Sequence, residues 1–139
     1  KQMRVLVAVA ISAILLSGCN CAIDVSVTGS LHEGITFALR EVRDIRLAGV
    51  WTRDEFGEWE EIWKVEGKDR IDSIRYGQPT AGLSVTFGGE GLKKGRLYTF
   101  TVETGDRLWA PCVGNVYLVV TSAGIVETCG TDECLRKYP

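Results

Sequence analysis

Apolar and polar residues alternate along most of this 139-residue chain, and this alternation limits its possible folds more than any other feature. Successive side chains of a β-strand point to opposite sides, so a period of two predicts strands with one buried face. Segments with this pattern are 23–27, 35–39, 45–47 and 83–87, and further strand candidates are 59–65, 71–76, 97–103, 116–121 and 125–128. Turn-forming residues separate them at 54–57, 67–69, 77–79, 88–91 and 122–124. The pattern predicts an all-β sandwich or barrel of about seven to nine strands. Only 39–47 is also compatible with a helical turn, and a long strand is expected there.

The first eighteen residues differ from the rest of the chain. Residues 5–16 carry no charge, Lys1 and Arg4 precede them, and the small residues Ser17 and Gly18 follow. A basic start, an apolar run and small residues at its end are typical of an export signal peptide. As a helix, about 12 residues would span only about 18 Å, whereas a hydrocarbon core is about 30 Å thick. Residues 1–18 are therefore expected to be a helical signal peptide and not a membrane-spanning helix.

The segment Leu16-Ser17-Gly18-Cys19 resembles the lipobox of bacterial lipoproteins. This resemblance implies cleavage between Gly18 and Cys19, lipid on the Cys19 sulfur, and a tether of residues 19–22. Cys21 fits the motif less well, because the residues before it lack the apolar and small pattern. Asn20 is not the aspartate that resembles an inner-membrane retention signal, so the resemblance implies anchoring in the outer membrane, facing the periplasm.

The charge of the mature chain argues against nucleic acid as a partner. Without residues 1–18, 121 residues remain, with 14 basic and 18 acidic side chains and a formal charge of −4. Lys93, Lys94 and Arg96 are too few to neutralise a phosphate backbone. The length suits one domain, so a single β-sandwich domain is expected over 23–139.

Export to an oxidising compartment decides how the cysteines are interpreted. With Cys19 acylated, Cys21, Cys112, Cys129 and Cys134 remain, and an even number favours two disulfides. Three connectivities are possible. Cys112 with Cys129 is preferred because the pair brackets a predicted hairpin, and Cys129 with Cys134, which would close a small loop, is the alternative. Zinc binding by four thiolates is a further alternative, although the spacings lack paired C-x-x-C knuckles.

The segment 92–102 resembles the entry to the penultimate strand of fibronectin type III and related immunoglobulin-like domains. Leu92, Gly95 and Tyr98 keep the spacing of a tyrosine corner, and Phe100 and Val102 continue the apolar alternation. The resemblance implies an immunoglobulin-like β-sandwich in which the Tyr98 hydroxyl bonds backbone at the corner. It also implies that Trp51 or Trp63 is the core tryptophan between the sheets.

Sequence motifs for catalysis or cofactor binding are weak. The single histidine, His32, is expected to be a solvated turn residue, and no G-x-S-x-G motif is present. The glycine-rich segment 88–91 lacks the lysine and Ser/Thr of a phosphate loop and is interpreted as a turn. The acidic group at 54–61 fits neither an EF-hand nor a defined acid and base pair, so solvated carboxylates are expected. We therefore predict no enzyme activity, no cofactor and no metal.

Aromatic residues are concentrated at 51–63. In a regular strand, Trp59 and Trp63 share a face, which is expected either to be core or to form an exposed strip that binds protein or sugar. The preferred function is a non-catalytic, lipid-anchored envelope protein that binds a protein partner, possible versions being an inhibitor or immunity protein. The alternative is an envelope protein that binds glycan, or an enzyme that hydrolyses it with carboxylates such as Glu58 and Glu61.

Overall fold

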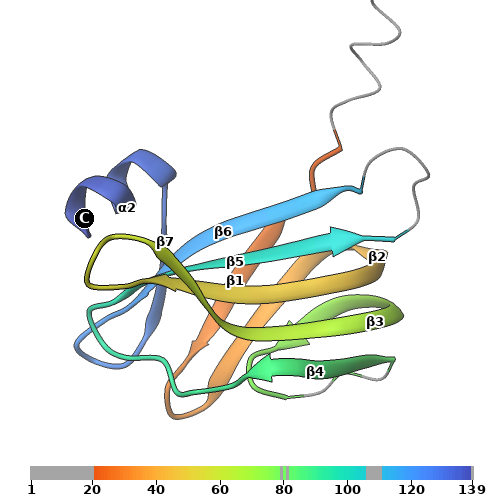
Figure 1. The fold of residues 1–139 in the computed structure, drawn as a ribbon, viewed down its shortest axis with the longest axis horizontal. Coiled ribbons are helices and arrows are strands. Elements are labelled where there is room, and N and C mark those ends of the chain that lie inside the picture. The colour runs from red at the N-terminus through yellow and green to blue at the C-terminus, as the bar shows by residue number, and fades with distance from the viewer. Residues whose placement is uncertain (1–20, 79, 81, 106–110, 139) are drawn as a thin grey trace, which may run out of the picture.

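The computed structural model describes residues 21–78, 80, 82–105 and 111–138, and these form seven strands and one short helix (Figure 1). In chain order the elements are β1 (Val25–Ser30), β2 (Gly34–Arg53), β3 (Trp59–Arg75), β4 (Leu83–Gly88), β5 (Leu97–Thr104), β6 (Val113–Val120), β7 (Val126–Cys129) and α2 (Thr131–Lys137). The predicted all-β class is confirmed. No helix in the described ranges is long and apolar enough to span a membrane.

All seven strands belong to one antiparallel sheet that folds over itself into two layers. The sheet order is β4-β3-β2-β5-β6-β7, and β1 pairs with β2 outside this path. The start of β2 pairs with β1 and the end of β3, whereas its second half pairs with the start of β3 and with β5. A register shift between Ala38 and Arg43 separates these halves. Figure 1 shows β1 and the start of β2, in orange, behind the other layer. The sandwich is therefore built by strands that run through both layers.

Aromatic stacking joins the two layers in the core. The rings of Phe37 on β2 and Phe100 on β5 stack with centroids 3.8 Å apart and planes 5° apart, and both side chains are fully buried. Around them lie alternate residues of every long strand, as the period of two predicted. These include Ile35, Leu39, Ile45, Val50, Val65, Ile74, Val102 and Leu118.

Two strands are longer than the separate apolar segments within them. The long strand expected at 39–47 is confirmed, since 35–39 and 45–47 are parts of β2. The segments 59–65 and 71–76 are joined within β3, so the strand ends predicted between them were wrong. The predicted turn at 67–69 is instead a bend within β3, beside a register shift between Ile45 and Leu47 of β2. Gly67 has a φ of +151° there, and a Cβ on it would lie 2.1 Å from the carbonyl oxygen of Gly82. Gly67 therefore lets β3 bend at the place where the sequence predicted a turn.

The Tyr98 geometry is the one that the tyrosine-corner resemblance implies. Tyr98 is buried at the start of β5, and its hydroxyl accepts a hydrogen bond of 2.7 Å from the backbone N–H of Lys93. Burial raises the pKa of the Tyr98 hydroxyl above its usual value. Of the two tryptophans proposed for the core, Trp63 is fully buried and packs on Tyr76, with ring centroids 5.1 Å apart.

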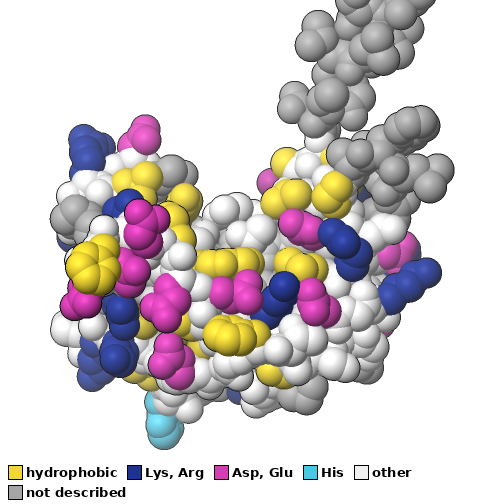
Figure 2. Space-filling view, in the orientation of Figure 1, with side chains coloured by type: hydrophobic (Ala, Val, Ile, Leu, Met, Phe, Trp, Pro, Cys, Tyr) yellow, Lys and Arg dark blue, Asp and Glu magenta, His cyan; other side chains and the backbone are white. Residues whose placement is uncertain are grey.

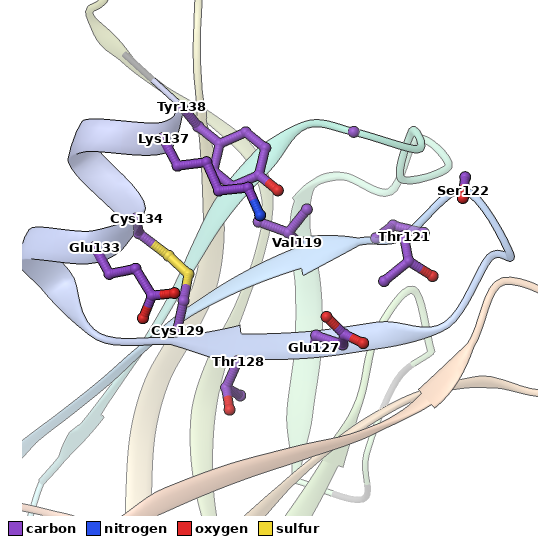
Figure 3. Close-up of a pocket in the computed structure, with 12 residues that line it drawn as sticks. Val119, Thr121, Ser122, Glu127, Thr128, Cys129, Glu133, Cys134, Lys137 and Tyr138 are labelled. Carbon is purple, nitrogen blue, oxygen red and sulfur yellow. A yellow bond between two sulfur atoms is a disulfide. The ribbon is translucent and has the colours of Figure 1, made fainter.

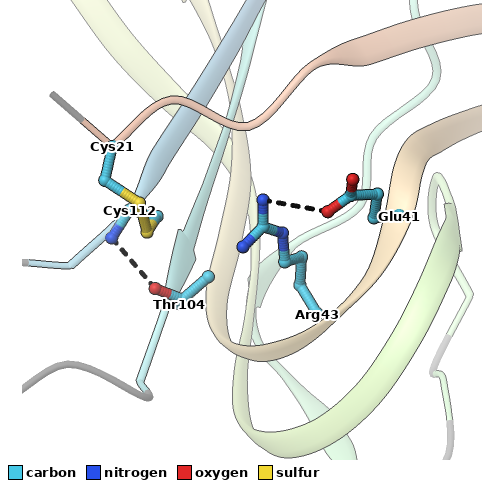
Figure 4. Close-up of a disulfide and its surroundings, with 5 residues drawn as sticks. All are labelled: Cys21, Glu41, Arg43, Thr104 and Cys112. Carbon is cyan, nitrogen blue, oxygen red and sulfur yellow. Dashed lines mark hydrogen bonds and ion pairs between the residues drawn. A yellow bond between two sulfur atoms is a disulfide. The ribbon is translucent and has the colours of Figure 1, made fainter.

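Two disulfides connect the four described cysteines, but the preferred pairing of Cys112 with Cys129 was wrong. Cys21 bonds Cys112, and Cys129 bonds Cys134 (Figures 3 and 4). The N-terminal segment lies beside the start of β6, which brings Cys21 next to Cys112. Cys129 is the last residue of β7 and forms its disulfide with Cys134 of α2, five residues later.

The helix α2 was not predicted. It has only seven residues, with Asp132 and Glu133 in its first turn and Arg136 and Lys137 in its last. This charge distribution complements the helix dipole and was the available sequence signal. The helix covers one end of the β5–β6 surface, where Leu97 and Val119 are buried with Cys134.

Candidate functional site

The sheet face that points away from the core carries three aromatic side chains from three strands. Register places Trp51 of β2 opposite Glu61 of β3 and Thr99 of β5, and Thr99 opposite Tyr117 of β6. Trp59 of β3 joins this group, because its ring centroid lies 6.0 Å from that of Tyr117. We call Trp51, Trp59 and Tyr117, with Arg53 and Glu61, the outer aromatic surface. Figure 2 views this side of the molecule, where hydrophobic side chains are interspersed with acidic and basic ones.

Trp51 lies against the backbone of its own strand. A Cβ on Gly49 would lie 2.8 Å from the Trp51 ring and 3.0 Å from the carbonyl oxygen of Trp63. The absence of a side chain at Gly49 therefore makes room for the indole ring. Trp51 is half-buried.

Trp59 is the most exposed aromatic residue of the surface, with 37% of its area accessible. The Arg53 guanidinium carbon lies 5.5 Å from the centroid of its ring, a cation–π arrangement that orients both side chains. Arg53 and Trp59 are also opposite each other in the β2–β3 register. The surface is thus fixed by cross-strand contacts before any ligand binds.

Trp59 and Trp63 do not share a face, so this prediction was wrong. In the β2–β3 register Val50 pairs with Trp63, and the next residue of β2, Trp51, pairs with Glu61. Ile62 is therefore an extra residue in β3 with no partner position in β2. The extra residue inverts the alternation, and Trp63 enters the core while Trp59 stays outside. Of the two proposed binding residues, only Trp59 is available to a partner.

Among the acidic residues of the β2–β3 connection, Asp54 organises the turn. Asp54 Oδ1 accepts hydrogen bonds from the backbone N–H groups of Phe56, at 2.8 Å, and Glu58, at 2.9 Å. The Glu58 and Glu60 side chains are exposed, and Glu61 is half-buried beside Trp51. Neither Glu58 nor Glu61 lines any cavity described for this part of the chain, so the structure gives this pair no shared cleft.

A separate cavity of about 320 Å³ lies between α2 and the β6–β7 hairpin (Figure 3). Val119 and the Cys129–Cys134 disulfide line it, together with the charged side chains of Lys137, Glu133 and Glu127. The Lys137 ammonium nitrogen lies 5.6 Å from the centroid of the Tyr138 ring. The three charged residues are exposed, so the cavity is an open, solvated depression with charges of both signs. Sequence reasoning missed it because it depends on α2.

His32 lies away from the described cavities, and the described residues form no metal-binding cluster. His32 is exposed in the β1–β2 turn, as predicted, and lines none of the described cavities. No group of three or more His, Cys, Asp or Glu side chains suited to a metal ion occurs within the described ranges. Gly18 and Cys19, the predicted cleavage and lipidation residues, lie outside the described residues.

Tyr117 and Arg53 belong to the outer aromatic surface but were not predicted as site residues. Both sit at outward positions of strands, and only the cross-strand register shows that they meet Trp59. The chain matches no protein-family model, no curated protein and no solved structure. The function is therefore argued from the outer aromatic surface itself.

Proposed function

We propose that this chain is a non-catalytic, lipid-anchored protein of the cell envelope that binds another protein through the outer aromatic surface. Its anchor is a lipid on Cys19, in the outer membrane and facing the periplasm. An inhibitor or immunity protein, which blocks a toxin or lytic enzyme by covering it, is a specific form of this function.

The observation that carries the proposal is an aromatic group on the sheet in which Trp59 is exposed and Trp51 and Tyr117 are half-buried. Trp51, Trp59 and Tyr117 come from three strands and are held by Gly49 and Arg53. Trp, Tyr and Arg are the side chains most enriched at binding hot spots, because they bury a large area with few rotatable bonds. Glu61, Lys64 and Glu66 lie on the adjoining strand and supply charges of both signs for a polar rim.

The two disulfides support export. Disulfides persist in oxidising compartments such as the periplasm and are rare in the bacterial cytosol. This agrees with a signal peptide at residues 1–18.

Glycan binding is the second candidate, and the position of Trp51 favours it. An indole ring that lies along a sheet, with Glu61 beside it, can stack on a sugar ring while the carboxylate accepts hydrogen bonds from hydroxyl groups. Protein binding is preferred because Trp59 and Tyr117 are tilted by 53° relative to each other and do not form one flat platform.

Affinity capture from native envelopes with the lipidated chain tests the proposal. We expect wild type to retain a protein partner and Trp59→Ala to bind it on the order of thirtyfold more weakly, the effect of a hot-spot loss of about 2 kcal/mol. Ile125→Ala is the matched control, because Ile125 is an apolar side chain with 53% exposure that follows the β6–β7 turn and is not part of the outer aromatic surface. Near-UV circular dichroism of each variant verifies that its fold is intact.

Three results would contradict this function. If Trp59→Ala stays folded and captures the partner as well as Ile125→Ala does, the outer aromatic surface is not the binding site. If the retained material is glycan and not protein, the second candidate replaces the first. If the mature N-terminal residue carries no lipid by mass spectrometry, the anchor is wrong.

A further inference from the structure

The N-terminal segment is attached to the sheet from Cys21 onward. The Cys21–Cys112 disulfide joins it to the residue before β6, with Cα atoms 4.8 Å apart (Figure 4). The backbone N–H of Ile23 donates to the carbonyl oxygen of Val113 at 3.0 Å, and the N–H of Val113 donates to that of Cys21 at 3.4 Å. Cys112 itself is buried, and its N–H donates to Thr104 Oγ1 at 2.9 Å. The described chain is therefore bound to the start of β6 from Cys21 onward.

Only Asn20 separates Cys21 from Cys19. Two Cα–Cα steps reach at most about 7 Å, even when fully extended. A lipid on Cys19 would thus hold the Cys21 end of the domain within about 7 Å of the lipidated residue.

The surface around Cys21 suits contact with a phospholipid layer. Val113 is 40% exposed beside Cys21, and Val42 is 45% exposed at the bend of β2. These parts lie close together, because a cavity of about 100 Å³ is lined by both the Ala22–Asp24 segment and residues 40, 41 and 43.

Two arginines lie at this bend, and the side chain of Arg40 is 79% exposed whereas that of Arg43 is 30% exposed. Arg40 pairs with Asp24 at 3.2 Å and Arg43 with Glu41 at 3.3 Å, so this surface has little net charge. Each guanidinium nevertheless carries five N–H donors, more than one carboxylate uses. We call Ala22, Val42, Val113, Arg40 and Arg43 the tether end.

We propose that the tether end rests against the phospholipid surface and that the Cys21–Cys112 disulfide sets this orientation. The inference rests on the lipid anchor of the proposed function and adds to it the direction in which the domain points. β6 then runs away from the membrane from Val113. Its eight residues rise by about 24 Å, so Ile125, beyond the next turn, is far from the lipid. In Figure 1 the described N-terminus and α2 lie at opposite ends of the sheet.

Site-specific photocrosslinking in vesicles tests the orientation. The full chain, processed and lipidated in a bacterial host, is placed in vesicles of phosphatidylethanolamine and phosphatidylglycerol. Benzoylphenylalanine replaces Val113 in one sample and Ile125 in the other. Both are exposed aliphatic residues of the same hairpin region, so they form a matched pair. After irradiation, mass spectrometry measures the fraction of protein bonded to phospholipid. We expect a several-fold higher fraction from position 113 than from position 125.

The outcomes separate this inference from the proposed function. Equal phospholipid crosslinking at the two positions, with lipid present on Cys19, would overturn the orientation and leave the binding function standing. Crosslinking of position 113 to a protein in native envelopes, without phospholipid adducts, would assign the tether end to a protein partner and overturn it as well. If Trp59→Ala does not weaken capture while position 113 still crosslinks to phospholipid, the proposed binding surface is wrong and the proposed orientation stands.

A double variant tests the role of the disulfide. With Cys21→Ser and Cys112→Ser, the lipid on Cys19 remains but the covalent clamp is lost. We expect the preference of position 113 over position 125 to fall. An unchanged preference in a variant with native near-UV circular dichroism would show that the disulfide does not set the orientation.

Discussion

At the residue scale, a local spacing identified Tyr98, whereas the positions of the tryptophans required the register. The contact between the Tyr98 hydroxyl and Lys93 spans five residues, so a short motif contains all of it. Trp63 was expected to face the same side as Trp59, and one extra residue, Ile62, reverses this. The consecutive apolar pair Ile62 and Trp63 was the only sign of a bulge, and it does not say which residue turns inward.

Replacing Tyr98 with Phe should lower the free energy of unfolding at neutral pH. It should also make that free energy fall less steeply as the pH rises above 10. The lost hydrogen bond costs about 1 kcal/mol. Burial raises the pKa of Tyr98 in the folded state, so above pH 10 the unfolded state binds fewer protons and stability falls as pH rises. Tyr98→Phe removes the contribution of Tyr98 to this pH dependence. The contribution of Tyr76, whose pKa is also raised by burial, remains. Urea unfolding from pH 7 to pH 11 measures both effects. Tyr117→Phe, a half-buried tyrosine, is the control, and an equal alkaline slope in both variants would contradict the assignment.

At the element scale, strand identity could be predicted but strand ends and the helix could not. A period of two reports which residues form strands, and β1, β4, β5, β6 and β7 lie close to their predicted segments. It does not report whether two segments join through a bulge, because that depends on the partner strand. The seven residues of α2 are too few for an independently stable helix, and its position depends on the Cys129–Cys134 bond and on burial of Leu97 and Val119.

The two disulfides should differ in their contribution to stability. Chain entropy gives about 4.5 kcal/mol for a loop of the Cys21–Cys112 size and about 2 kcal/mol for one of the Cys129–Cys134 size. The sequence separations are 91 and 5 residues. We expect Cys21→Ser with Cys112→Ser to lower the urea midpoint more than Cys129→Ser with Cys134→Ser. In the second double variant, hydrogen exchange should increase first in α2. Protection of α2 equal to wild type would show that the disulfide is not what holds it.

At the scale of the whole molecule, the chain must bring together residues that local patterns cannot relate. The fold class followed from composition and alternation, because only β-strands bury one face at a period of two. The disulfide pairing did not, since Cys21 and Cys112 meet only when the N-terminal segment lies beside β6. The outer aromatic surface likewise combines β2, β3 and β6, so its members were visible as residue types but not as a group.

The two layers should unfold in one cooperative step, because β2 and β3 run through both of them. Phe37→Ala removes one ring of the stack between the layers and should cost about 3 to 5 kcal/mol, the range for a buried phenylalanine. Phe87→Ala, at a position with 51% exposure on the edge strand, should change stability by no more than about 0.5 kcal/mol. Urea unfolding followed by tryptophan fluorescence and by far-UV circular dichroism measures both. We expect the fluorescence and circular dichroism midpoints of Phe37→Ala to shift together, because neither layer has enough strands to stay folded without β2 and β3. Separate midpoints for the two signals would show that the layers unfold independently, and the shared strands would then not couple them.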